Sequence, residues 1–268
     1  MGSRSVTHIA GLVASKAVTS SVMLIVTLSI GRVLGPELLG RWSLIVAAGV
    51  MLHTLCVNWT HASTVRFGSE EWARSRSLNI TFGTRLPILV VCMALVATLL
   101  VWSPFRWQEI WFGINPADRW LVGLFTVSIW IMAEAQATVQ AIDKLAWQSI
   151  SGPIIAIVAI ATTLFLLKSP QLKFAVLAIT VPSIVGWGTV WISALSVGIS
   201  RWRKLWPKRI GIHLAYGLSL IPAFAFGYLS DWGDQLLLSR MTSVSEVGMF
   251  SLSYQFLVLI MAASGVIT

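Results

Sequence analysis

The stretch RVLGPELLGRWSL, residues 32–44, joins two long apolar segments and is echoed by RMTSVSEVGMFSL, residues 240–252. At a constant offset of 208 residues, the echo matches Arg32 to Arg240, Gly40 to Gly248, Trp42 to Phe250, Ser43 to Ser251 and Leu44 to Leu252. Both copies lie at a joint between apolar segments. Solenoid repeats have periods of about 20–50 residues, whereas many transporters are built from duplicated halves. The echo predicts such a duplication, with chance similarity as the alternative.

The composition indicates an all-α, polytopic integral membrane protein. Apolar residues make up 56% of the chain and charged residues 11%, whereas about a quarter of the residues in soluble domains are charged. A helix needs about 20 predominantly apolar residues to cross a bilayer, and the runs here are continuously apolar rather than alternating as in a β-barrel. Eight stretches qualify: Ile9–Ile30, Leu39–Trp59, Leu86–Trp102, Trp120–Ala141, Ile150–Leu167, Phe174–Ile199, Ile212–Leu238 and Met249–Ile267.

The distribution of lysine and arginine predicts a cytoplasmic N-terminus, since cytoplasmic loops carry an excess of these residues. With that orientation eleven cations, Arg85 among them, fall in cytoplasmic segments and seven on the opposite side. The basic run RWRKLWPKR, residues 201–209, could suggest nucleic acid. A basic cluster beside a membrane segment and interleaved with Trp more often contacts anionic lipid headgroups, so we expect membrane lipids and not nucleic acid as its partner.

The same basic run divides the chain. We expect an N-terminal six-helix lobe over residues 1–200, a cytoplasmic linker over 201–211, and the first two helices of an incomplete second lobe over 212–268. Because six is an even number, the second lobe begins on the same side of the membrane as the first. The two units are therefore expected to be parallel repeats, related by an axis along the membrane normal.

Ionisable groups inside spans are costly and usually face a partner or a water-filled cavity. Lys16 heads a polar stripe that continues with Thr19 and Ser20 at helical spacing. This stripe predicts a cavity wall that attracts an anion. The alternative is that Lys16, close to the start of its span, extends its amine to the cytoplasmic headgroups.

Glu134 lies near the middle of the fourth predicted span, with Trp130 and Thr138 one turn away on the same face. A carboxyl group at that depth resists ionisation, so Glu134 is a candidate proton carrier for ion coupling. The alternatives are a hydrogen-bonded structural acid or a partner for Lys16.

The seventh span carries two acids near its end. Tyr228, Asp231 and Gln235 recur at spacings of three and four, with Asp234 on the adjoining edge of that face. Two carboxylates one turn apart repel unless a cation or a proton lies between them, so Asp231 and Asp234 are candidates for coupling to an ion. The alternative is that the helix ends earlier and both acids lie at the interface.

The sequence offers no support for enzymatic catalysis. His8, His53, His61 and His213 are not at metal-ligand spacing, and we find no phosphate-binding loop, nucleophile elbow or dinucleotide fingerprint. We therefore predict no metal and no cofactor. Cys56 and Cys92 fall inside predicted spans and are expected to be core cysteines.

The runs GRVLGPELLGRWSL, residues 31–44, and SDWGDQLLLSRMTSVSEVGMFSLSYQ, residues 230–255, resemble the polysaccharide transporter branch of the multidrug, oligosaccharidyl-lipid and polysaccharide flippase superfamily. The resemblance extends over the chain in helix order, although both motifs are degenerate. By this resemblance the joint after the first helix comprises Gly31, Arg32, Gly35, Pro36 and Gly40. Asp234 and Gly248 match the acid and the glycine of the seventh-helix region.

The resemblance implies two six-helix lobes around a cavity in the bacterial cytoplasmic membrane, alternating access, and an oligosaccharide substrate joined through diphosphate to a polyprenyl lipid. Lys16 and Arg32 are then candidates to bind the diphosphate, while Glu134, Asp231 and Asp234 are candidates for proton or sodium coupling. Glycan polymerase or ligase proteins are the partners that it implies.

The chain departs from this family pattern after its eighth apolar segment, because the pattern continues for at least four more helices. We therefore expect a truncated gene or a fragment of a longer protein, and a half-transporter that pairs with another chain is the alternative. Two other functions stay open: a drug or toxin exporter of the same superfamily, and a membrane scaffold for polysaccharide enzymes.

Overall fold

The computed structural model describes residues 3–101, 109, 112–144, 147–168, 171–198 and 207–264, without the side chains of 3–20, 23, 24, 27, 166, 167, 207, 208 and 255–264. All regular secondary structure in these ranges is helical, which confirms the all-α prediction. The elements are α1 (Ser3–His53), the π-helix η1 (Thr54–Asn58), α2 (Trp59–Ser75), α3 (Asn79–Val101), the 3-10 helix η2 (Pro116–Asp118), α5 (Arg119–Ala141), α6 (Gln148–Lys168), α7 (Leu172–Gly198), α8 (Pro207–Leu218), α9 (Ile221–Met241) and α10 (Val244–Ser264).

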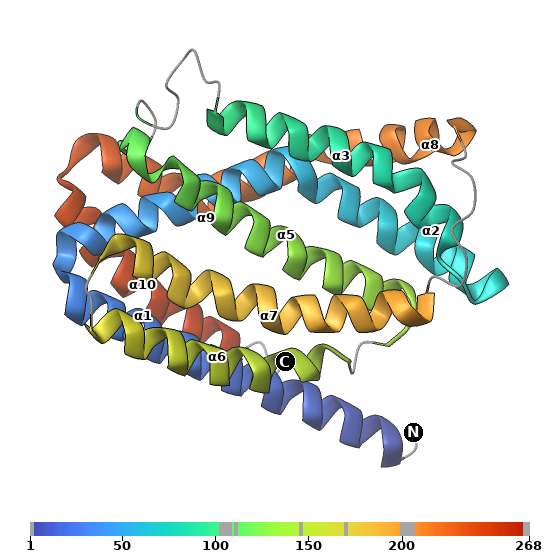
Figure 1. The fold of residues 1–268 in the computed structure, drawn as a ribbon, viewed down its shortest axis with the longest axis horizontal. Helices are drawn as coiled ribbons and strands as arrows, with labels where there is room; N and C mark the ends of the chain where they lie inside the picture. Colours follow the sequence, from blue (N-terminus) through green and yellow to red (C-terminus); the bar gives the residue numbers. More distant parts are fainter. Residues whose placement is uncertain are drawn as a thin grey trace.

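The α1 segment is two helices joined by a sharp turn at Gly35. Gly35 has φ 74° and ψ 173°, a conformation that side-chain-bearing residues rarely adopt, and Pro36 follows it. Figure 1 shows the chain running from the N-terminus to one end of the bundle and reversing there. The first copy of the echo is therefore a turn between two helices, as the sequence predicted.

The second copy is a turn of the same kind. Thr242 ends α9 in an extended conformation, and α10 begins two residues later. The side chain of Ser243 accepts a hydrogen bond from the backbone N–H of Glu246, whose carboxylate accepts one from the N–H of Ser243. This reciprocal capping box starts α10 without a glycine.

The two copies pack against each other. A Cβ atom on Gly40 would overlap the backbone carbonyl of Val244, and a Cβ on Gly248 would overlap that of Pro36. Val244 and Gly248 are the equivalents of Pro36 and Gly40 at the offset of 208 residues, so the close contact is reciprocal. A contact in which each segment makes the same interaction with the other is what a two-fold axis between the two segments produces.

One further echoed pair lies in this contact. The hydroxyl groups of Ser43 and Ser251 are hydrogen-bonded to each other, and Ser43 also donates to the side-chain oxygen of Gln235 at 2.8 Å. We call the contact between residues 36–43 of α1 and residues 244–251 of α10 the α1–α10 seam. Its geometry argues against chance similarity as the source of the echo.

Six helical stretches of the described chain are long and apolar enough to cross a membrane, which is consistent with a polytopic membrane protein. They are Leu28–Ser75, Asn79–Val101, Pro116–Ala141, Gln148–Phe165, Leu172–Gly198 and Arg209–Met241. The side chains of most of the predicted first span, Ile9–Ile30, and of most of the eighth, Met249–Ile267, lie outside the described residues. The remaining six predicted spans each fall within or largely overlap one of these stretches.

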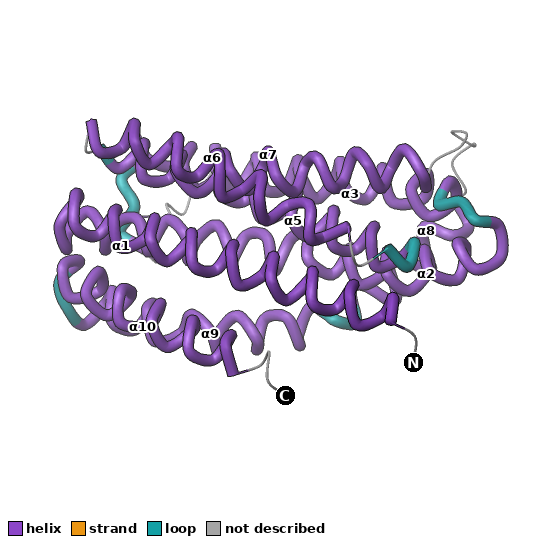
Figure 2. Tube along the Cα trace, turned by 90° about the horizontal axis from the view of Figure 1, so that it is seen from below, coloured by secondary structure: helices purple, strands orange, loops and turns teal. Residues whose placement is uncertain are grey.

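The second part of α1 lies at the centre of the bundle. The whole α1 segment packs against α10 and α6, and its first part contacts α6 around Val26 and Thr163; α7 packs on α6 and α5. Figure 2 shows α9 and α10 along one side, with α1 between them and α6 and α7. In the most apolar window of Leu28–Ser75, 67% of the residues are buried, against 11% for Arg209–Met241. The first stretch is thus the core of the fold and the last is peripheral.

The segment between the second and third predicted spans, expected as a connecting segment, is mostly helical. The helix that contains the second span continues through η1 and α2 to Ser75, and α3 begins at Asn79. The carboxylate of Glu71 accepts hydrogen bonds from the backbone N–H groups of Ile80 and Thr81 at 2.8 and 2.7 Å. These N–H groups have no partner within α3, so the acid fixes where that helix starts.

Two further findings concern the seventh predicted span and the predicted linker before it. The seventh, Ile212–Leu238, is interrupted by a turn at Ser219–Leu220, because Pro222 cannot donate the backbone hydrogen bond that a continuous helix requires. Residues 201–206 of the predicted linker lie outside the described residues, while 207–211 form the start of α8.

Candidate functional site

The most polar buried region described lies where α2, α3 and α5 meet. Arg85 of α3 and Glu134 of α5 form an ion pair with side chains 1% and 0% exposed. Nη1 of Arg85 donates to Oε2 of Glu134 at 2.7 Å and Nη2 donates to Oε1 at 2.6 Å, which is the two-bond geometry of a strong pair. A buried pair of this kind is sensitive to change, since loss of either partner leaves an uncompensated charge.

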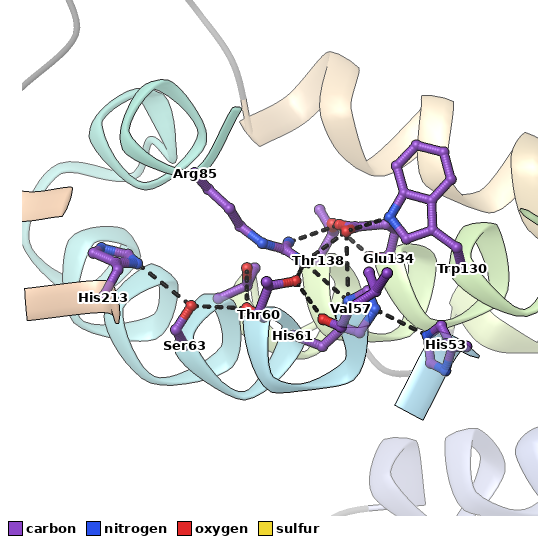
Figure 3. A network of polar contacts seen from close by, with 11 residues as sticks. His53, Val57, Thr60, His61, Ser63, Arg85, Trp130, Glu134, Thr138 and His213 are labelled. Atoms are coloured by element: carbon purple, nitrogen blue, oxygen red, sulfur yellow. Dashed lines mark hydrogen bonds and ion pairs between the residues drawn. The ribbon is translucent and has the colours of Figure 1, made fainter. Parts of the chain in front are cut away.

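The surroundings of Glu134 were partly predicted from the sequence. The indole N–H of Trp130 donates to Oε1 of Glu134 at 3.0 Å, and the hydroxyl of Thr138 donates to its backbone carbonyl at 2.7 Å. The shared helical face of these three residues is thereby confirmed. Figure 3 shows Trp130 and Arg85 approaching the carboxylate from opposite sides. The cationic partner of Glu134 in the structure is Arg85, where the sequence suggested Lys16.

Arg85 departs from its predicted place. The sequence placed it just before the third predicted span, in a segment counted as cytoplasmic, whereas in the structure it lies inside α3 and is fully buried. Its Nη2 also donates to the hydroxyl of Thr60 at 2.7 Å and lies 3.0 Å from Nδ1 of His61. One guanidinium group thus ties α3 to both α2 and α5.

Two histidines extend the ion pair towards α1. Nδ1 of His61 lies 3.5 Å from Oε1 of Glu134, and its Nε2 lies 3.3 Å from Nε2 of His53. The two imidazole rings stack with centroids 5.4 Å apart, and both residues are buried. We call Arg85, Glu134, His61 and His53 the charge network; Figure 3 shows all four together.

The π-helix explains why these histidines meet. Eight residues of regular α-helix turn the chain by about 80° beyond two full turns, so residues 53 and 61 would point to different sides. The wider turn of η1, Thr54–Asn58, takes up about one extra residue. The separation then resembles that of residues seven apart, which share a face. π-Helical turns within α-helices are frequent at functional sites.

The polar contacts continue towards α8 but leave the charge network. Ser63 donates to the backbone carbonyl of Thr60 at 2.7 Å, and Nδ1 of His213 lies 3.4 Å from the Ser63 hydroxyl. Because the hydroxyl hydrogen of Ser63 is already used, His213 is the donor in that contact. This branch ends on a backbone carbonyl.

The proposed substrate-binding residues lie elsewhere. The side chains of Lys16, Thr19 and Ser20 lie outside the described residues, so their polar stripe stays a prediction. Arg32 is exposed and lies close to the turn at Gly35. It is therefore at one end of the bundle.

The two acids of the seventh span lie on the outer side of α9. Asp231 and Asp234 are both exposed, away from the core. Tyr228 and Gln235 are buried instead, where Tyr228 donates to the carbonyl of Ala47 and Gln235 accepts from Ser43. Tyr228 and Gln235 of the predicted face thus contact α1, while Asp231 and Asp234 lie outside that contact.

No protein-family model, curated protein or solved structure matches this chain.

The charge network places opposite charges and an imidazole side by side in the buried core. The carboxylate of Glu134 is held by a guanidinium group and an indole N–H, and the imidazole of His61 lies within reach of both ions. His61 of α2 lies close enough to pair either with Arg85 of α3 or with Glu134 of α5. Each choice links a different pair of helices.

Proposed function

We propose that this chain belongs to a membrane transporter that moves a polyprenyl-diphosphate-linked oligosaccharide across the bacterial cytoplasmic membrane by ion-coupled alternating access. In this proposal the chain crosses the membrane eight times with its N-terminus in the cytoplasm. The observation that carries the proposal is the reciprocal α1–α10 seam. A transporter built of two parallel lobes needs a contact at which equivalent helices of the lobes meet.

The charge network gives the proposal its second support. Ionisable residues within membrane spans are costly and are retained mainly on ion and substrate pathways. Arg85 and Glu134 lie within the stretches Asn79–Val101 and Pro116–Ala141, and both are buried. We place ion coupling in the charge network around Glu134, with Asp231 and Asp234 of α9 as the other candidates.

The substrate assignment rests on the sequence resemblance and on charge. A diphosphate that leaves water needs fixed cations, for which Lys16 and Arg32 are our candidates, with Thr19 and Ser20 as polar neighbours of Lys16. The lipid tail would lie outside, between helices, while the sugar occupies a polar cavity.

Complementation tests the proposal. The gene that encodes this chain, read to its stop codon, is expressed in a bacterial strain that lacks the flippase for a surface polysaccharide. We expect restored surface polysaccharide, measured on gels of cell envelopes. Resistance to cationic drugs without restored polysaccharide would favour an exporter, and neither activity would favour a scaffold.

A pair of matched variants tests the role of the network in the same strain. Glu134→Gln removes the buried charge and should abolish complementation at normal protein level. Glu70→Gln makes the same chemical change at an exposed position of α2 and should leave complementation intact. Equal activity of both variants would remove Glu134 from the coupling mechanism.

A further inference from the structure

Nη2 of Arg85 has one hydrogen fewer than it has acceptors. Nη2 of Arg85 carries two hydrogens, yet three acceptors lie within hydrogen-bonding distance of it: Thr60 Oγ1 at 2.7 Å, Glu134 Oε1 at 2.6 Å and His61 Nδ1 at 3.0 Å. The Thr60 hydroxyl cannot reverse its role without losing its own bond to the carbonyl of Val57 at 2.8 Å. One acceptor must therefore share a hydrogen, and the longest contact is the one to His61.

The same contacts assign the hydrogens of both histidines. Arginine has no acceptor atom, so Nδ1 of His61 accepts and its ring hydrogen is on Nε2. That Nε2–H group faces Nε2 of His53 at 3.3 Å, which must then accept, so the hydrogen of His53 is on Nδ1. The two rings form a directed chain from Arg85 to His53.

We infer that the His53–His61 pair binds the coupling proton, entering at Nδ1 of His61, and that the coupling ion is therefore H⁺. This inference rests on the proposed transport function, for which it identifies the ion and its site. Binding forms an N–H bond at Nδ1 of His61, breaks the N–H bond at its Nε2 and forms one at Nε2 of His53. The positive charge then lies on His53.

The new N–H group at Nδ1 has an acceptor in place. Oε1 of Glu134 lies 3.5 Å away, close to hydrogen-bonding distance. Arg85 gives up its bond to His61 and keeps those to Glu134 and Thr60, so every acceptor around Nη2 has its own donor. The proton thus exchanges an Arg85–His61 contact between α3 and α2 for a His61–Glu134 contact between α2 and α5.

Glu134 is the competing site for the proton, and three arguments favour the histidine pair. A free imidazole is more basic than a free carboxyl group by about two pK units. A proton on Glu134 would also discharge the carboxylate that neutralises the buried guanidinium of Arg85, which is costly. Finally, transfer to His53 moves the added charge one ring away from Arg85.

The other titratable and charged groups on the packed elements set the field at His61. It is faced by Arg85 from α3, Glu134 from α5 and His53 from the end of α1. The further groups in this region are Cys56 of η1, Cys92 of α3, and His213 and Arg209 of α8. The Arg85 cation and the burial of His61 oppose an added charge in the arrangement seen here. Proton binding should therefore accompany a change of helix packing.

Nitrogen NMR of the full chain, labelled with ¹⁵N-histidine in lipid nanodiscs, tests the inference without any substrate. At high pH we expect His61 with its hydrogen on Nε2 and His53 with its hydrogen on Nδ1. On acidification His61 should gain a hydrogen at Nδ1 at the same midpoint at which His53 becomes cationic. A His61 that keeps its Nε2–H form while Glu134 takes the proton, read from the carboxyl ¹³C signal, would overturn the inference.

Variants separate this pair from the other buried histidine. His61→Gln should remove the titration of His53, and His53→Gln should shift the midpoint of His61, because one proton is shared. His213→Gln, at a buried histidine bonded to Ser63, should leave both unchanged. Independent titration of His53 in the His61→Gln variant would refute a shared proton.

Tryptophan fluorescence supplies a second readout. Trp130 donates to the same Oε1 atom that would accept from His61. The difference spectrum between wild type and Trp130→Phe should change at the midpoint of the histidine pair, and this change should be absent in His61→Gln. A constant Trp130 signal across that midpoint would contradict the new contact.

The two proposals can fail separately. If wild type restores no polysaccharide, the flippase proposal falls, and with it the assignment of the proton to polysaccharide transport. If wild type complements but His61 keeps its high-pH form throughout, only the proton site falls.

Discussion

The α1–α10 seam and the charge network are both buried contacts between helices, but opposite means hold them together. In the seam, Gly40 and Gly248 bring backbones into direct contact, and the contacts described there include no buried ion pair. In the network, long side chains hold α2, α3 and α5 together through an ion pair and two histidines. The backbones of the seam fit together in only one way, whereas the groups of the network can pair in several ways.

This difference between the seam and the network indicates which of the two contacts can rearrange. Close backbone packing tolerates little sliding, because any shift brings atoms into overlap. In the network, three acceptors compete for the two hydrogens of Arg85 Nη2, so partners can exchange there at small cost. We therefore regard the seam as a pivot and the network as the element that changes.

The largest expected effect comes from filling the seam. Gly40→Leu and Gly248→Leu each place a side chain where a backbone carbonyl lies, so each should destabilise the fold by more than about 5 kcal/mol. Because the contact is reciprocal, the two losses should be similar. Heating in the presence of a thiol-reactive dye measures them, since Cys56 and Cys92 are free and buried until the protein unfolds.

Gly233→Leu is the matched control for these variants. Gly233 lies in α9, and a Cβ added there would meet no atom within 4 Å, so the same substitution should have little effect. A strong asymmetry between Gly40→Leu and Gly248→Leu would contradict the two-fold relation of the seam.

The next effect comes from breaking the ion pair. Arg85→Met or Glu134→Leu alone leaves a buried charge without its partner and should cost about 3–5 kcal/mol in the same assay. The double variant has no charge left at this pair and should be more stable than either single one, as replacement of buried pairs by apolar residues often is. Its complementation should nevertheless be lost.

A double variant less stable than both single ones would show that the two side chains act separately. Conversely, a fully active double variant would show that the network is structural only.

The comparison also explains what could be predicted from the sequence. The seam was visible because its residues recur in order at a fixed offset, and the turns at both copies follow from that. The helical face of Trp130, Glu134 and Thr138 was visible because its members are four residues apart. Both are local or periodic patterns.

Most of the network could not be predicted in this way. Arg85 and Glu134 are 49 residues apart, and Arg85 precedes the apolar run, where a cation usually marks the membrane surface. Glu71 caps the start of α3 at Asn79, ahead of Arg85, so that Arg85 lies inside the helix. His53 and His61 meet because η1 changes the helical register, and their spacing in the sequence carries no sign of that turn.

A smaller effect is expected at the centre of the seam. Ser43→Ala removes the donor to Gln235 and the bond to Ser251, and it leaves the buried amide oxygen of Gln235 without that partner. The cost should be about 1–3 kcal/mol. Thermal unfolding by the thiol assay measures it, and Ser253→Ala, at an exposed position of α10, is the control.

A loss below that of the Ser253→Ala control would mean that these hydrogen bonds do not stabilise the seam, which would then rest on the glycines alone.

The smallest effect on stability is expected at Asp234, and that makes it the sharpest test of where coupling lies. Asp234 lies on α9 outside the buried core, so Asp234→Asn should change the stability by less than about 0.5 kcal/mol. If α9 carries the coupling ion, complementation should fall although the fold is intact. If the His53–His61 pair carries it, Asp234→Asn should complement like wild type while His61→Gln does not. Loss of activity in Asp234→Asn together with full activity in His61→Gln would move the coupling site from the charge network to α9.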